Sequence, residues 1–238
     1  MIKNDDKKTT LKMRIIVAAI AVFMLGSSFA LYASIVLNYS NNETAKSANK
    51  EKEDRFNELY EAYMKEVEEY TNKLSDKYFD EFVSYKSRVT AFNTADAQKE
   101  LVKEDLKKGD GDKITYEYDD DGNVIGLNQE YSAYYIGWLS DETIFDSSFN
   151  DANNPSSLNE PLAGSTNLIQ GWIEGVEGMR IGGVREITIP STLAYGENES
   201  GSIPANSPLK FIIMVVDAGE EPQPSEELEQ LYYQLFAQ

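Results

Sequence analysis

The sequence of 238 residues contains no cysteine and no histidine. Without cysteine the chain has no disulfide, no cysteine-based zinc site and no lipid thioether at its N-terminus. Without histidine it has no Ser-His triad and no histidine general base. Any chemistry must therefore use carboxylates, hydroxyl groups, tyrosine, lysine, backbone groups or shape alone, and we expect neither a metal ion nor a cofactor.

Positive charge is also scarce, because 22 basic residues face 41 acidic ones and the net charge is −19. So acidic a chain repels the phosphate backbone of nucleic acids, and we expect no nucleic-acid partner. The excess of carboxylates is typical of a well-solvated surface.

Long apolar runs are absent except near the N-terminus, where residues 15–37 carry no charge. As a helix this run would extend ~34 Å, enough to cross a hydrocarbon core of ~30 Å. The basic residues that precede it predict a cytoplasmic N-terminus at residues 1–14 and a bulk outside the cytoplasm. The alternative is a cleavable signal peptide, since Ser28-Phe29-Ala30 resembles a cleavage site. The run continues for seven residues past Ala30, which favours a retained membrane anchor.

Polar residues 38–50 predict a tether, and a charged helical segment is predicted for residues 51–106. Its apolar positions follow a heptad-like spacing that changes phase, which suits two helices or a stutter. The two stripes are Phe56, Tyr60, Tyr63, Val67, Tyr70 and Leu74, then Tyr78, Phe79, Phe82, Tyr85, Val89 and Phe92. We expect an aromatic seam packed within a helical hairpin or against the next domain; self-association as a stalk is the alternative.

From the stretch KKGDGD at residues 107–112 onward, the pattern is mostly that of β-strands. The predicted strands are KITYEY, EYSAYYIGWL, TIFDSS, VREITI and LKFIIMVV. The acidic stretch DDDGN, residues 119–123, lacks the spacing of an EF-hand and predicts a hairpin turn. Residues 220–238 predict a tail with a short amphipathic helix, which either docks on its own chain or binds a partner.

One stretch of residues 167–183, NLIQGWIEGVEGMRIGG, has apolar residues at helical spacing and yet three glycines among them. Each interior glycine costs a helix about 1 kcal/mol relative to alanine. One of the two tryptophans of the chain, Trp172, lies in this stretch. A helix with this composition needs a reason for its glycines.

The segments YIGWLSDETIFDSS, LIQGWIEGVEGMRIGGVREITIPSTLAYG and IPANSPLKF resemble, in order and spacing, the FKBP-type peptidyl-prolyl isomerase family. The resemblance covers about residues 113–217, and it implies an isomerase domain at residues 107–219. The implied fold class is α+β: an antiparallel sheet wrapped around a short helix, with an apolar pocket between them, preceded by the transmembrane helix and the long helical segment. The glycines would then allow close approach of helix and sheet.

Matching the motifs residue by residue assigns the site. The resemblance implies catalytic roles for Asp146, Trp172 and Tyr195, and substrate contacts for Tyr135, Phe145, Leu168, Ile169, Ile203 and Phe211. Two departures concern specificity: the loop GENESGSIP lacks the histidine common in the family, and residues 149–167 offer no aromatic beyond Phe149. Both put substrate preference and inhibitor sensitivity in doubt.

These residues suit a reaction without a nucleophile, because rotation about an X-Pro bond requires only that amide resonance be broken. We expect proline-containing polypeptides as substrates and a role in folding extracytoplasmic proteins. Two alternatives remain: a non-catalytic chaperone that grips proline-containing segments, and a scaffold built by self-association of the helical segment.

Overall fold

The structure is a computed structural model, and it describes residues 43–236. These residues form two compact units. The larger one comprises residues 67–221, and the smaller one combines residues 43–66 with residues 222–236. Within residues 43–236, no helix has the length and apolar character needed to cross a bilayer. The predicted anchor at residues 15–37 lies outside the described residues and stays a prediction.

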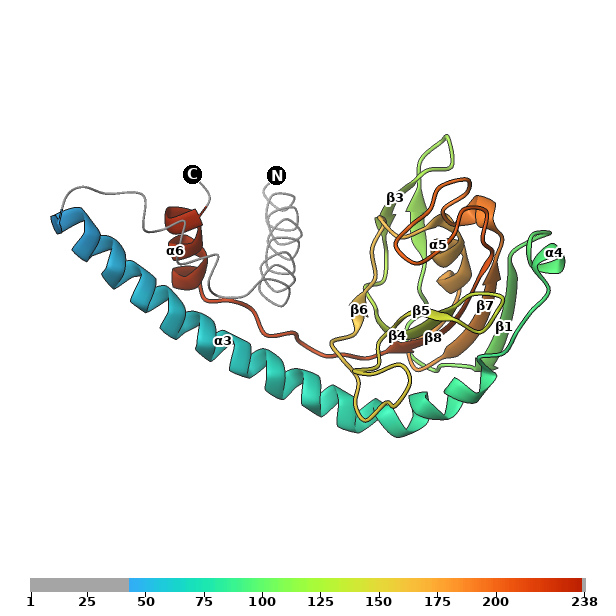
Figure 1. Cartoon of the computed structure of the whole chain (residues 1–238), viewed down its shortest axis with the longest axis horizontal. Helices are drawn as coiled ribbons and strands as arrows, with labels where there is room; N and C mark the ends of the chain where they lie inside the picture. The colour runs from blue at the N-terminus through green and yellow to red at the C-terminus, as the bar shows by residue number, and fades with distance from the viewer. Residues whose placement is uncertain (1–42, 237–238) are drawn as a thin grey trace. The chain divides into compact units, whose positions relative to one another are not determined.

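The larger unit is built on an antiparallel sheet whose main strands follow the order β1-β7-β8-β4-β5, with β6 paired to β4. The strands are β1 (Val102–Lys107), β4 (Ser132–Trp138), β5 (Ile144–Ser147), β6 (Leu162–Ala163), β7 (Val184–Ile189) and β8 (Leu209–Val216). A separate hairpin pairs β2 (Tyr116–Tyr118) with β3 (Val124–Leu127). The sheet curves around the short helix α5 (Gln170–Val176), as Figure 1 shows. This is the α+β arrangement that the sequence predicted.

Both faces of the central strands are apolar, because alternate residues of a strand point to opposite faces. On the inner face, residues such as Ala133, Phe211 and Ile213 pack around α5. On the outer face, Tyr134, Trp138 and their neighbours form a second buried cluster. A strand buried on both faces reads as a nearly continuous apolar run, which is what β8 (LKFIIMVV) shows.

Helix α3 (Glu43–Ser84) supplies the cover of the outer face. Within the larger unit, its Leu74 and Phe82 are buried against the outer side of the sheet, and Phe82 has no exposed surface. The ring of Phe82 lies 5.3 Å from that of Phe149 and 6.1 Å from that of Tyr134. The predicted packing of the aromatic seam against the next domain is thus found for this part of the helix.

The smaller unit joins an earlier part of α3 to the C-terminal helix α6 (Glu226–Phe236). Phe56 is buried against Leu228 and Leu231, and its ring meets that of Phe236 edge-on at 5.2 Å. Arg55 forms a bidentate pair with Glu227, with N···O distances of 2.8 and 2.9 Å. The tail therefore docks on its own chain in this structure.

Two sequence-based boundaries need correction. Helix α3 already begins at Glu43, so residues 43–50 of the predicted tether are helical. The helix continues unbroken through Ser84, which agrees with the stutter and not with a break into two helices. The change of packing partner comes earlier than the change of phase, because Tyr63 packs with α6 whereas Tyr70 and Leu74 already pack on the sheet. Finally, the predicted helical segment does not extend to residue 106: residues 85–88 form a 3₁₀ turn (η1), a single turn of helix follows at α4 (Thr94–Ala97), and residues 102–107 are strand β1.

Strand β1 was missed because its sequence, VKEDLK, is mostly polar and exposed. It lies at the edge of the sheet and pairs with β7. This pairing stabilises the strand although its composition does not favour one. The hairpin predicted at residues 119–123 is present between β2 and β3. There the carboxylate of Asp119 accepts hydrogen bonds from the backbone N–H groups of Asp121 and Asn123.

Candidate active site

The glycines of α5 let this helix lie directly on the sheet. A methyl group on Gly171 would collide with Ile189, and one on Gly175 would come within 2.7 Å of the Ile187 side chain. Both isoleucines belong to β7, so the helix backbone touches the strand that supports it. The entropic cost of the glycines is therefore offset by close packing, as the sequence suggested.

Arg185 fixes the far end of α5, and sequence reasoning assigned it no role. Its guanidinium donates to the carbonyl oxygen of Gly175 at 2.7 Å and to the carboxylate of Asp105 at 2.6 Å. Only 10% of its side chain is exposed. A cation at a helix C-terminus is favoured by the free carbonyl groups there, and Asp105 on β1 balances its charge.

Four aromatic rings converge on the inner face beside α5, and we call Tyr135, Phe145, Trp172 and Phe211 the ring cluster. Phe211 is central: its ring centroid lies 5.3 Å from that of Trp172, 5.5 Å from Phe145 and 6.4 Å from Tyr135. Tyr135 also meets Trp172 edge-on at 5.5 Å. Trp172 and Phe211 are buried, whereas Tyr135 and Phe145 are partly exposed. The cluster thus has a buried floor and an accessible side.

Gly137 makes this cluster possible. A methyl group at this position on β4 would lie 2.6 Å from the ring of Phe211 and 2.7 Å from the ring of Phe145. No larger residue fits without moving one of the two rings. The sequence signal was present in the stretch Tyr135-Ile136-Gly137, but the resemblance had drawn attention only to its tyrosine.

Asp146 and Tyr135 form a hydrogen-bonded pair at the exposed side of the cluster. The Tyr135 hydroxyl donates to Oδ2 of Asp146 at 2.6 Å. Burial raises the pKa of Tyr135 well above its ordinary value, and the bond to Asp146 raises that pKa further. The tyrosine is therefore a fixed neutral donor near neutral pH. The arrangement agrees with an orienting role for Asp146 and calls for no acid–base chemistry.

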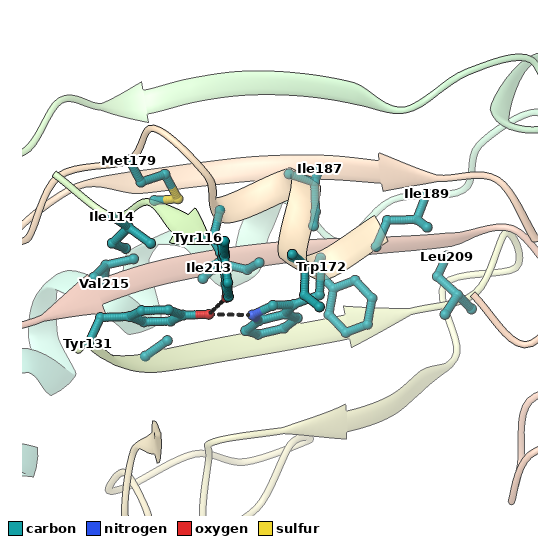
Figure 2. Close-up of a cluster of buried hydrophobic side chains, with 14 of the residues drawn as sticks. Ile114, Tyr116, Tyr131, Trp172, Met179, Ile187, Ile189, Leu209, Ile213 and Val215 are labelled. Atoms are coloured by element: carbon teal, nitrogen blue, oxygen red, sulfur yellow. Dashed lines mark hydrogen bonds between the residues drawn. The ribbon is translucent and has the colours of Figure 1, made fainter. Parts of the chain in front are cut away.

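A chain of buried hydrogen bonds holds Trp172. Its indole Nε1 donates to the hydroxyl of Tyr131 at 3.1 Å, and that hydroxyl also pairs with the hydroxyl of Tyr116 at 3.0 Å (Figure 2). Burial raises the pKa of Tyr131 and of Tyr116. Sequence reasoning missed both tyrosines, because nothing local indicates that residues 41 positions apart will meet.

The remaining residues of the predicted site surround the cluster. Leu168 and Ile169, which precede α5, pack on the inner core and stay partly exposed, while Ile203 is buried in the same core. Tyr195 follows the 3₁₀ turn η2 (Ser191–Leu193) and is 37% exposed. It is close enough to Tyr135 to contribute to that residue's raised pKa. The nine assigned residues thus gather on one side of the sheet, and their individual roles stay predictions.

Phe149 belongs to the opposite side. It is buried in the outer cluster, against Phe79 and Phe82. The polar segment after β5 therefore brings its one aromatic residue to the helix cover and not to the ring cluster.

An antiparallel sheet curved around a short helix, with rings converging between them, defines a class of apolar binding site. Residues 124–216 match the family model described as FKBP-type peptidyl-prolyl cis-trans isomerase. A FK506-binding protein of Neisseria meningitidis serogroup C is 39% identical over 100 residues, which are 42% of this chain and 88% of that protein. The chain therefore belongs to the FKBP-type peptidyl-prolyl cis-trans isomerase family, and it is an enzyme of that class.

Two other relatives match over a similar length of this chain. FK506-binding protein 2 of Debaryomyces hansenii is 43% identical over 89 residues, which are 36% of this chain and 61% of that protein. The FKBP-type peptidyl-prolyl cis-trans isomerase FkpA of Aeromonas hydrophila is 44% identical over 89 residues, 37% of this chain and 31% of that protein. The family model begins at residue 124, so α3, α4 and β1 lie outside it.

Proposed function

We propose that this chain is a membrane-tethered isomerase that accelerates the cis–trans isomerisation of X-Pro bonds in extracytoplasmic proteins as they fold. The observation that carries the proposal is the ring cluster, with its buried floor of Trp172 and Phe211 and its partly exposed Tyr135 and Phe145. A proline ring is a compact apolar group that such a set of rings can accept.

The proposed mechanism needs no covalent step. The barrier to amide rotation is about 18–20 kcal/mol, because twisting the C–N bond breaks its resonance. The planar amide has the larger dipole and loses more by leaving water, so an apolar site favours the twisted form relative to the planar one. Catalysis of this kind is compatible with a chain that has neither histidine nor cysteine.

Polar groups at the edge of the cluster would hold the peptide. In this proposal the hydroxyl of Tyr195 donates to a substrate carbonyl group and fixes the turn around the proline. Asp146 keeps Tyr135 in place through the 2.6 Å hydrogen bond, and its carboxylate accepts hydrogen bonds from polar groups of the substrate. Leu168, Ile169 and Ile203 complete the apolar wall.

The tether and the location are inferred from sequence alone. The uncharged run of residues 15–37 and the basic residues before it support an anchor that leaves the enzyme domain outside the cytoplasm. Fractionation of the expressed full chain tests the anchor: it should stay with membranes after an alkaline wash. A chain that is released, with its N-terminus cut after Ala30, would instead support the signal-peptide alternative.

Refolding of a proline-limited protein tests the function. The full chain in detergent micelles should accelerate the slow refolding phase, which takes tens of seconds or more without a catalyst. Trp172→Ala and Tyr195→Phe should each reduce the acceleration, and Lys73→Ala on the exposed side of α3 should not. Acceleration that both site variants leave unchanged would refute this site.

The same experiment separates the enzyme from the alternatives. A chaperone that only grips proline-containing segments would suppress aggregation without raising the isomerisation rate. A scaffold would sediment in a concentration-dependent manner through its helical segment. The aromatic stripes of α3 contact α6 within one unit and the sheet within the other, which leaves them less available for the self-association that the scaffold requires.

A further inference from the structure

We infer that Gln98 is a positioning residue that braces the two loops carrying Tyr195 and Ile203, so that a segment upstream of the family domain shapes the substrate site. The inference rests on the proposed function for its kinetic consequence. Its structural basis is independent and lies in one side-chain amide.

The amide of Gln98 uses both of its ends. Its Oε1 accepts hydrogen bonds from the backbone N–H of Ser191 at 2.9 Å and from the Ser191 hydroxyl at 3.0 Å. Its Nε2 donates to the backbone carbonyl oxygen of Asn206 at 2.8 Å. One side chain thereby joins two backbone positions that are 15 residues apart.

These two positions also belong to a closed ring of hydrogen bonds, which links Gln98, Asn206, Gly196 and Ser191. The N–H of Asn206 donates to the carbonyl oxygen of Gly196 at 2.7 Å, and the N–H of Gly196 donates to that of Ser191 at 2.8 Å. Gly196 follows Tyr195 directly, and Asn206 lies three residues after Ile203. Gln98 completes this ring of hydrogen bonds from outside the loops and is its one member that no family motif contains.

The conformations of the loops explain why a brace is useful. Asn206 has a φ of +59°, a left-handed conformation that L-residues with a side chain seldom adopt. Gly196 also has a positive φ, of 59°. Because Asn206 is not a glycine, its left-handed conformation depends on its surroundings, and its two hydrogen bonds, one to Gly196 and one from Gln98, help to hold it.

Gln98 itself is held firmly. It is the C-cap of α4, and its N–H donates to the carbonyl oxygen of Thr94. The helix is capped at its other end by Asn93, whose side chain accepts from the N–H of Asp96, and Ala97 is buried. Just before it, the N–H of Phe92 donates to the carbonyl oxygen of Ser140. The segment that presents Gln98 is therefore fixed to the domain.

The expected consequence is on binding more than on the rotation step. If a smaller fraction of molecules has the loops in the arrangement that binds a peptide, the apparent affinity for the peptide falls in proportion to that fraction. The rings of the cluster lie on β4, β5, β8 and α5 and are not touched by this change. Loss of Gln98 should thus raise KM and leave kcat nearly as it was.

The experiment compares three variants of the full chain on proline-containing peptides. Gln98→Met keeps the length of the side chain and removes all three hydrogen bonds; it should raise KM by about three- to tenfold, the scale of the net contribution of one hydrogen bond. Gln98→Glu keeps the acceptor for Ser191 but places a carboxylate oxygen against the Asn206 carbonyl oxygen, so its KM should also rise above that of the wild type. Lys99→Met, an exposed neighbour whose partner is Asp96, is the matched control and should leave KM unchanged.

Hydrogen exchange of the amides of Ser191 and Asn206 supplies a readout that does not depend on activity. Both should exchange faster in Gln98→Met than in the wild type. Unchanged exchange, or a wild-type KM in Gln98→Met, would overturn the inference. If the wild-type chain fails to isomerise peptides, the proposed function falls, while the exchange measurement still decides whether Gln98 braces the loops.

Discussion

The inner and outer faces of the sheet both carry tyrosine and tryptophan, but the two faces have different roles. On β4, Tyr134 points outward and is completely buried, while its neighbour Tyr135 points inward and stays partly exposed. Trp138 is fully buried on the outer face, and Trp172 forms the floor on the inner face. Composition does not separate the two faces. The two faces differ in the helix that covers them. The long helix α3 covers the outer face with its aromatic rings, and the short glycine-rich helix α5 lies on the inner face.

This difference indicates that the outer face contributes mainly to stability and the inner face mainly to binding. The outer cluster has complementary apolar groups from α3 and is fully covered, so its rings contribute burial. The inner cluster instead leaves two rings, Tyr135 and Phe145, partly uncovered. We therefore expect changes on the outer face to alter stability, and changes on the inner face to alter catalysis.

The largest effect should come from removing a ring of the outer face. Phe82→Ala leaves a cavity between α3 and the sheet and should lower the free energy of unfolding by about 3–5 kcal/mol. Urea unfolding measures this loss, with Lys73→Ala as the exposed control on the same helix. The activity per folded molecule should not change. A loss below about 1 kcal/mol would mean that the helix does not cover the sheet as described.

A substitution on the inner face should have the opposite balance. Gly137→Ala forces the rings of Phe145 and Phe211 apart, and overpacking of this kind costs about 1–3 kcal/mol. Because the rings form the proposed site, we expect kcat/KM to fall about tenfold or more while the protein stays folded. Gly126→Ala on β3, where a flexible Glu117 side chain is the nearest neighbour, is the control. Full activity in Gly137→Ala would argue against the ring cluster as the site.

A smaller effect should follow from loss of the buried hydroxyl that holds Trp172. Tyr131→Phe leaves the indole N–H without its partner and should cost about 1–3 kcal/mol in stability. It should also lower kcat/KM by freeing the orientation of the indole. Tyr116→Phe, which keeps the bond between Tyr131 and Trp172, should lower kcat/KM less. Equal activities for the two variants would show that the indole does not depend on this bond.

The smallest effect should be that of pH. Tyr135 has a pKa raised by burial and by its bond to Asp146, so it stays protonated below its ordinary value of about 10. Since the folded pKa lies above the unfolded one, the stability that this group contributes is complete below about pH 10 and is lost only as the pH rises further. With no histidine in the chain, kcat/KM should be flat from pH 6 to 9. A step near pH 7 would show that a titrating group takes part.

The sequence was informative where one strong pattern decided the structure. Strands β7 and β8 occupy the ranges that were predicted, because their apolar runs are flanked by clear breaks. Four rings of the predicted site also lie close together, while the roles assigned to the site residues stay predictions. Strand β1 was not predicted, because an exposed edge strand has no apolar pattern in its sequence. It forms because it pairs with the neighbouring strand β7.

Contacts between distant residues account for the rest of what was missed. Tyr131, Arg185 and Gln98 each act through a partner far away in the sequence, and the patterns around them do not indicate which partner that is. The helix cover was anticipated as an aromatic seam, but its division between α6 and the sheet was not. Which face of a periodic helix meets which surface is decided by tertiary packing, and periodicity alone does not contain that information.

The two tryptophans allow the most direct test, because Trp172 lies on the inner face and Trp138 on the outer one. The full chain labelled with 5-fluorotryptophan should give two ¹⁹F resonances, which Trp138→Phe assigns. Titration with a proline-containing peptide should shift the resonance of Trp172 in a saturable manner and leave that of Trp138 in place. A peptide that shifts only the resonance of Trp138 would contradict the account, because substrate would then engage the face that we assign to stability.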